Sequence, residues 1–142
     1  MPSLLSVLGQ DGIDPDALLK AIPYCRHLGV RARVDDRGLI LVLPFQPQLI
    51  GNPMLPALHG GVIGSLLETA ALAQVIYETR STKLPRPVDI SIDYLRSGRD
   101  RDSFARARIA KQGRRVLNVQ AEMWQDDPTK PIATLRGHML AD

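Results

Sequence analysis

The chain has 142 residues, of which 44% are hydrophobic, 23% are charged and 4% are aromatic, and its formal net charge is +3. This length suits one compact core, so a single domain over residues 1–142 is expected. One cysteine and three histidines without ligand spacing exclude a disulfide framework and predict no metal site. The few aromatic side chains offer no platform for stacking bases, so no nucleic-acid partner is expected.

No targeting signal is apparent at the start of the chain. The opening MPSLLSVLGQDG has neither a basic flank nor a cleavage motif, so no signal peptide is expected. The apolar stretch Val62–Ile76 is shorter than a membrane span and contains Glu68, so no membrane partner is expected. The unpaired Cys25 fits a reducing compartment. We therefore expect a soluble cytoplasmic protein.

Helix signals mark the N-terminal part, which we interpret as a helical extension over residues 1–27. Asp14 followed by Pro15 is an N-cap residue followed by a proline at the first helical position. This pair predicts a short helix from about Pro15 to Ile22, ending near Pro23.

Two strands and a long loop are expected next. Arg31–Val34 and Leu39–Phe45 are typical of strands, and the Asp35–Gly38 sequence between them is typical of a turn. The stretch Gln46–Ala57 contains three prolines and one glycine, which predicts a loop.

The most informative segment is His59–Leu67, which reads HGGVIGSLL and is followed by Glu68. Its apolar positions, continued to Ile76, cover nearly every direction of a helix, so a helix buried on all sides is expected. A glutamate in such a helix needs a partner or a task. Gly61 and Gly64 lie on about the same side of the helix as Glu68. The pattern predicts a backbone-lined channel that ends at an acid held out of water.

Four stretches with period-two alternation follow, joined by short turns. Such alternation predicts an antiparallel meander with one dry face and one wet face. Two strands, one long helix and four strands together predict an α+β fold, in which a curved antiparallel sheet wraps around one central helix. The four stretches are 88–94, 104–109, 117–123 and 132–140.

Basic residues are concentrated between Arg96 and Arg115, where eight of the 18 in the chain fall within 20 positions. A local positive field of this kind suits a phosphorylated ligand or a polyanion. For any single arginine in the segment, a solvated strand face is the more frequent explanation.

The helix start HGGVIGSLLETA resembles that of the hotdog-fold acyl-CoA thioesterases. It is preceded by Asn52, and its acid lies nine positions after His59. VDISIDYLRSG after the helix and KQGRRV at a strand turn are also similar, over roughly Leu28–Leu140. The resemblance is strongest to the phenylacetic-acid-pathway and 4-hydroxybenzoyl-CoA thioesterases. It implies a hotdog fold and hydrolysis of an acyl- or aryl-CoA thioester to the free acid and coenzyme A. It also implies a homodimer or tetramer, with coenzyme A as part of the substrate and no separate cofactor.

The same resemblance implies roles for individual residues. Glu68 would attack the thioester carbonyl or activate a water, and the backbone N–H of Gly60 would polarise the thioester oxygen. Asn52 would orient water or substrate in the facing subunit's half-site. His59 would cap the helix or anchor the loop, with direct chemistry as the less frequent alternative. The implied coenzyme A contacts are Arg96, Ser97, Lys111, Gly113, Arg114 and Arg115.

Two departures from the family pattern leave alternatives open. Asn52 lies seven residues before His59 instead of six, and Pro87 stands where the family often has a water-holding Ser or Thr. Ser65 and Thr69 are possible substitutes. A non-hydrolytic acyl-CoA-binding or regulatory protein of the same fold is therefore a second hypothesis. A hydroxyacyl-thioester dehydratase, with a histidine and a carboxylate converging on one carbon–carbon bond, is a third.

Overall fold

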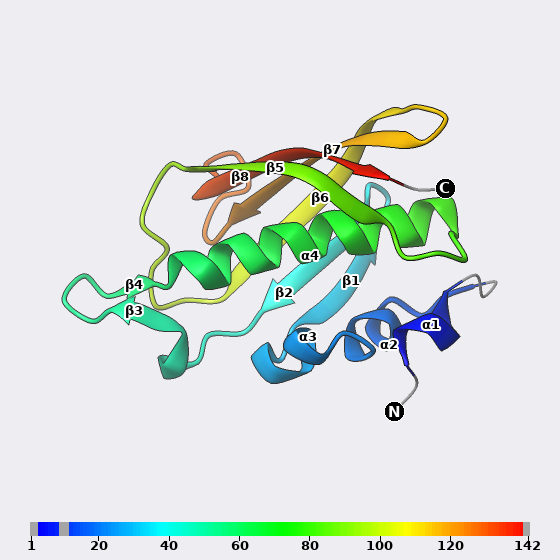
Figure 1. Ribbon diagram of the computed structural model, residues 1–142. Helices are drawn as coiled ribbons and strands as arrows, with labels where there is room; N and C mark the ends of the chain where they lie inside the picture. The colour runs from blue at the N-terminus through cyan, green and yellow to red at the C-terminus, as the bar shows by residue number, and fades with distance from the viewer. Residues whose placement is uncertain (1–2, 9–11, 141–142) are drawn as a thin grey trace.

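A six-stranded antiparallel sheet curves around one long helix, α4 (Gly60–Thr79), in the computed structural model, which describes residues 3–8 and 12–140 (Figure 1). This architecture confirms the α+β prediction. The expected domain over 1–142 and the extension over 1–27 both include residues outside the described part. The strands are β1 (Arg31–Asp35), β2 (Gly38–Leu43), β5 (Arg86–Tyr94), β6 (Ser103–Gln112), β7 (Val116–Trp124) and β8 (Ala133–Leu140).

The strand order is β1-β2-β6-β7-β8-β5, and every neighbouring pair is antiparallel. The simple meander predicted from the sequence is therefore wrong at one place, because β5 pairs with β8 instead of β6. Leu41 on β2 lies opposite Ala105 on β6, and Ile90 on β5 lies opposite Gly137 on β8. Alternation determines which face a residue takes, but it does not determine which strand it pairs with.

Helix α4 packs against β2, β6, β7 and β8 on one side and against α2 on another. Buried leucine, isoleucine, valine and alanine side chains along the helix form the centre of the core. The face with Gly61, Ser65, Glu68 and Leu72 is exposed or only half-buried. The expectation of a helix buried on all sides is therefore wrong, because the sheet and the N-terminal helices together leave this face of α4 uncovered.

The length and composition of α4 would also allow it to cross a membrane. It has 20 residues, which is longer than the apolar stretch recognised in the sequence, and 56% of its most apolar window is buried inside the fold. Packing against the sheet accounts for this apolar character, as in the core helix of a soluble protein.

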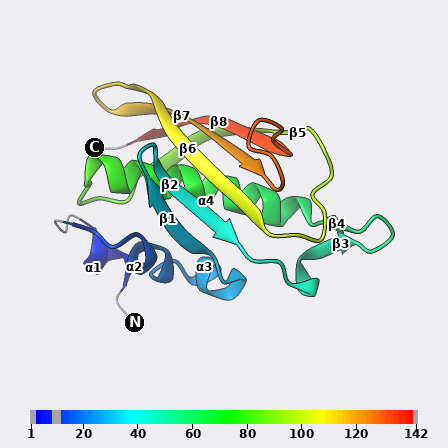
Figure 2. The same cartoon turned by 180° about the vertical axis from the view of Figure 1, so that it is seen from behind.

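The N-terminal extension covers the β1 edge of the sheet (Figure 2). Asp14 caps the first long helix of the extension as predicted, but Pro23 begins a further helix instead of ending the first one. The Oδ1 atom of Asp16 accepts a hydrogen bond of 2.9 Å from the backbone N–H of Ala32 on β1. An edge strand with its N–H groups occupied is protected from pairing with other chains. The helices are α1 (Leu4–Val7), α2 (Pro15–Lys20) and α3 (Pro23–Leu28).

The stretch expected to be a loop contains a short 3₁₀ helix, η1 (Pro47–Leu49), and a hairpin of β3 (Ile50–Asn52) and β4 (Ala57–Leu58). Two backbone hydrogen bonds of 2.9 Å fasten the end of this segment. The N–H of Leu58 donates to Gly98, and the N–H of His59 donates to Leu49. The start of α4 is thereby held from two sides.

Gly137 lets β5 approach β8 closely, so its replacement by Ala should destabilise the protein. A Cβ at Gly137 would collide with the carbonyl oxygen of Asp89 and reach 3.3 Å from the Cα of Ile90. We expect Gly137→Ala to lower the free energy of unfolding by about 1–3 kcal/mol in urea titrations, as overpacking typically does. Gly61→Ala is the control, because a Cβ there meets nothing within 4 Å. Equal stabilities of the two variants would contradict this interpretation.

Asp35 at the end of β1 should make stability depend on pH. A hydrogen bond from the Arg106 side chain, followed in size by one from the backbone N–H of Arg37, holds the pKa of Asp35 below its ordinary value. Because the folded state favours the carboxylate, this stabilisation is complete above the unfolded pKa of about 3.9 and is lost as the pH falls through the folded pKa. We expect Asp35→Asn to have a lower free energy of unfolding than the wild type near pH 6. This difference in free energy should disappear at acidic pH.

The neighbouring exposed Asp36 provides the control in the same urea titrations. We expect Asp36→Asn to follow the wild-type pH profile. If the difference in free energy of unfolding between wild type and Asp35→Asn stayed constant from pH 6 down to about pH 3, the stabilising role of the Asp35 carboxylate would be contradicted.

Candidate functional site

The first turn of α4 presents two unpaired backbone donors. His59 is the N-cap, and its carbonyl accepts the N–H groups of Val62 at 3.1 Å and Ile63 at 3.2 Å. The N–H groups of Gly60 and Gly61 have no acceptor in the described part of the chain, and both residues are exposed. Such N–H groups lie at the positive end of the helix dipole, where they stabilise negative charge.

Tyr94 fixes the position of this turn, although it was not among the site residues expected from the sequence. Its hydroxyl donates a 2.9 Å hydrogen bond to the carbonyl of Gly60. A Cβ on Gly64 would lie 3.4 Å from the same hydroxyl and 3.2 Å from Ile92. Gly60 and Gly64 are one helical turn apart, so a large β5 side chain can lie over them. The four-residue spacing of Gly60 and Gly64 could have indicated that a large side chain packs over this turn. Tyr94 was a candidate for that side chain, because it lies two residues after Ile92 and so on the same face of β5.

The predicted channel lined by two glycines is wrong in its details. Gly64 is covered by Ile92 and Tyr94, whereas a Cβ on Gly61 would meet nothing within 4 Å. Only Gly61 is therefore open on the side of the helix that carries Glu68.

A hollow of about 390 Å³ lies beside the start of α4 and brings together three of the predicted site residues. Gly60 and Tyr94 form one side, and Arg96 and Ser97 form another. Arg96 therefore contributes a positive charge to the same hollow as Gly60. The arrangement suits a ligand with a polarisable carbonyl and an anionic part.

Glu68 lies on the open face of α4 and is exposed in the single chain. The expectation that it is held out of water is therefore wrong for one subunit. Its carboxylate makes no hydrogen bond or ion pair with any described residue. It follows Gly60 by eight residues, which corresponds to about 12 Å along a helix axis.

Asn52 makes a local turn contact in the β3–β4 hairpin. Its Oδ1 accepts the backbone N–H of Met54 at 3.0 Å, and its side chain does not line the hollow beside Gly60. His59 makes no side-chain cap bond, and its ring packs against Gly51. Within one chain, neither Asn52 nor His59 lines the hollow beside Gly60. Their roles in catalysis stay predictions.

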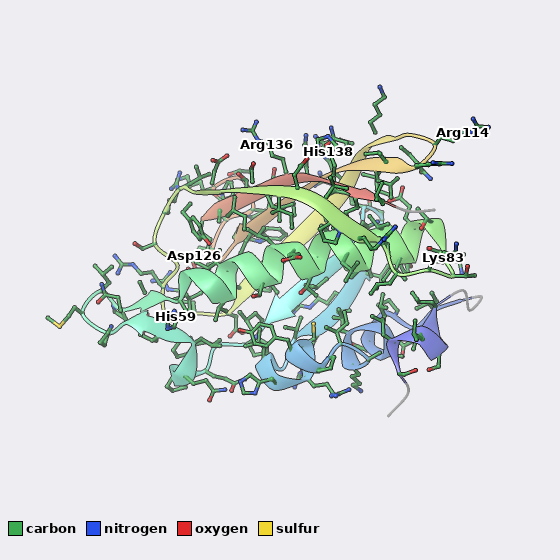
Figure 3. The ribbon with its side chains drawn as sticks, viewed as in Figure 1. His59, Lys83, Arg114, Asp126, Arg136 and His138 are labelled. Carbon is green, nitrogen blue, oxygen red and sulfur yellow. The ribbon has the colours of Figure 1, made fainter. Side chains whose placement is uncertain are left out.

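The residues expected to contact coenzyme A separate into two groups. Arg96 and Ser97 lie at the start of α4, whereas Gly113 and Arg114 line a hollow near Thr79 at its other end. Lys111 and Arg115 belong to the same β6–β7 hairpin region as Gly113 and Arg114. Figure 3 shows His59 and Arg114 at opposite ends of the molecule. The helix between the groups is about 30 Å long, so they do not form one patch on a single chain.

The two possible substitutes for a water-holding residue differ in their surroundings. Thr69 is hydrogen-bonded to the Cys25 side chain, and burial raises the pKa of that thiol to about 11 despite this bond. Ser65 lies on the open face between Gly61 and Glu68. Pro87 lies exposed on β5. Ser65 is therefore the better placed of the two.

Comparisons with known proteins agree with this architecture. The family model of the thioesterase superfamily matches residues 55–132. A medium/long-chain acyl-CoA thioesterase, YigI of Salmonella typhimurium, is 30% identical over 120 residues, which are 75% of this chain and 77% of that protein.

Two solved structures show the same fold. One, from Chromobacterium violaceum, is 41% identical with a TM-score of 0.73, covering 88% of this chain and 87% of that one. The other, a Bacillus halodurans protein with CoA, is 25% identical with a TM-score of 0.68, covering 80% and 71%. The hotdog architecture and the predicted family are confirmed: this chain belongs to the thioesterase superfamily.

Proposed function

We propose that this protein hydrolyses acyl-CoA thioesters to the free acid and coenzyme A. The observation that carries the proposal is the pair of N–H groups at Gly60 and Gly61, which have no acceptor within the described residues, with Gly60 lining a hollow that also contains Arg96. The YigI relative, named a medium/long-chain acyl-CoA thioesterase, and the CoA in the Bacillus halodurans structure support the substrate class. The relatives also support a soluble protein, and we assign it to the cytoplasm.

The chemistry follows from these groups. The N–H of Gly60 stabilises the oxyanion that forms on the thioester oxygen, and one such donor contributes about 3–4 kcal/mol in comparable sites. Glu68 either attacks the carbonyl carbon or takes a proton from an attacking water. If Glu68 attacks, the carbon–sulfur bond breaks to leave a mixed anhydride on Glu68, which a water then hydrolyses to the free acid, and the leaving thiolate takes a proton from solvent. If Glu68 activates a water, the same bond breaks directly to give the acid, and the proton held by Glu68 passes to the leaving thiolate. Both roles of Glu68 end in the same products.

Two copies of the chain are needed for this reaction. Within one chain, Glu68 and the Gly60 N–H are about 12 Å apart along the helix axis, more than one thioester group spans. A second copy that covers the open face of α4 brings its own Glu68 towards this Gly60 and withdraws both carboxylates from water. The facing subunit also supplies the second half-site in which Asn52 is expected to act.

The uncovered edge strand β5 supports this self-association. The β1 edge is occupied by the N-terminal extension, whereas β5 has no neighbour on its outer side within the described residues. Val88, Tyr94 and Leu95 on and beside β5 are 58%, 56% and 55% exposed. Antiparallel pairing of two β5 strands around a two-fold axis closes both edges. The same pairing also brings the β6–β7 hairpin of the second copy, which carries Arg114, towards the start of α4 in the first copy. The basic residues near Arg96 and those near Arg114 then lie close together.

Replacing the acid tests the reaction. We expect Glu68→Gln to reduce release of free coenzyme A from octanoyl-CoA by about 100-fold or more, because the amide can neither attack nor accept the proton. Coenzyme A is measured with a thiol reagent. Glu78→Gln is the matched control, since it makes the same change at another exposed position of α4 and should retain wild-type turnover.

Turnover by Glu68→Gln at the wild-type rate would refute the role of the acid. Saturable binding without hydrolysis across a panel of aryl, short-chain and medium-chain thioesters would favour the non-hydrolytic alternative. Hydration of an enoyl thioester would favour the dehydratase.

Charge on β5 tests the association. We expect Val88→Glu to shift the mass measured by light scattering towards one chain and to lower coenzyme A release, because a carboxylate in an apolar interface stays unpaired. Val34→Glu is the matched control, since Val34 is 52% exposed on β1 at the covered edge. An unchanged mass for Val88→Glu, or an equal loss for both variants, would contradict an interface at β5.

A further inference from the structure

A second groove lies on the other side of the start of α4. It has a volume of about 640 Å³ and is bounded by α3, η1 and the first turns of α4, with His59 at the junction. Its size is in the range of roughly 300–1,000 Å³ that is typical of small-molecule sites. None of the lining residues is a lysine, arginine, aspartate or glutamate. The groove is therefore a poor site for the phosphates of coenzyme A.

The floor of the groove is apolar and its rim carries two rings. Leu28, Leu49 and Val62 are 4%, 2% and 8% exposed, so they form a rigid base. The rings of Tyr24 and His27 stack at a centroid distance of 6.1 Å with an interplanar angle of 19°. Flat rings over an apolar base suit a hydrocarbon chain.

The groove lies on the helix face that carries the acid. Gly61 and Ser65 line it, and Glu68 follows on the same face one turn later. The hollow with Arg96 lies on the Gly60 side of the same turn. A thioester carbonyl at the N–H groups of Gly60 and Gly61 therefore has a hollow with Arg96 on one side and, on the other, a groove without lysine, arginine, aspartate or glutamate.

We infer that this groove holds the acyl chain of the substrate, and that α3 of the N-terminal extension selects thioesters with acyl groups longer than acetyl. The inference rests on the proposed function. It assigns Tyr24 and His27 to substrate selection, and it separates the acyl end of the ligand from the coenzyme A end.

Chain-length selectivity tests the groove. We expect Tyr24→Ala to lower the ratio of kcat/KM for octanoyl-CoA to kcat/KM for acetyl-CoA by about tenfold, because the acyl chain loses one wall. His27→Ala should lower the same ratio. Tyr24 is 43% exposed, so its removal costs little folding stability. Arg26→Ala is the matched control on α3, since Arg26 bonds to the carbonyl of Lys20 and does not line the groove.

A binding measurement separates this inference from the proposed reaction. In a Glu68→Gln background, calorimetry gives the Kd values of octanoyl-CoA and acetyl-CoA without hydrolysis. We expect Tyr24→Ala to raise the Kd of octanoyl-CoA by about tenfold and to leave the Kd of acetyl-CoA nearly unchanged. Wild-type protein that hydrolyses neither ester would contradict the proposed function. Unchanged octanoyl-to-acetyl ratios, equal losses for both esters, or no binding of octanoyl-CoA would each overturn the groove assignment.

Discussion

One layer of sheet can cover only one side of a helix, and the organisation of this protein follows from that constraint. The buried side of α4 provides the core, while its exposed face carries Glu68, whose carboxylate has no partner among the described residues and is in contact with water. The N-terminal extension covers the β1 edge through Asp16, and the β5 edge has no corresponding cover in the described residues. The open helix face and the open strand edge adjoin each other. One surface of a second copy could therefore cover the open face of α4 and the open edge of β5 together.

The start of α4 is unusually well fixed for a segment so exposed. The backbone bonds of Leu58 to Gly98 and of His59 to Leu49 hold the chain before the helix, and Tyr94 holds the carbonyl of Gly60. None of these bonds uses the N–H groups of Gly60 and Gly61. Donors that are immobilised without being satisfied need no reorganisation when negative charge develops on a ligand, which is the physical basis of oxyanion stabilisation. Glycine at both positions leaves the approach free of side chains.

The sequence was sufficient for features that depend on local patterns. Alternation located the strands, the Asp14–Pro15 pair located the start of α2, and the HGG motif located the start of α4. Features that depend on distant neighbours could not be read in this way. Where β5 pairs with β8, Gly137 allows the backbone of Asp89 to approach closely, because it has no Cβ. Nothing in the sequence of β5 indicates that β8 is its neighbour. The exposure of Glu68 was not predicted, because the apolar pattern of a helix does not show how many of its sides other elements cover.

The basic segment from Arg96 to Arg115 illustrates how a patch in sequence differs from a patch in space. Because β6 runs along the sheet between the two groups of basic residues, Arg96 lies at the start of α4 and Arg114 at its far end. One chain thus offers a ligand at Gly60 only part of this positive charge. In the proposed two-fold antiparallel association, the ends of the helices would be exchanged, so that each start of α4 would meet the hairpin of the other copy. The proposed association would therefore complete the positive charge around the ligand and cover the acid in the same step.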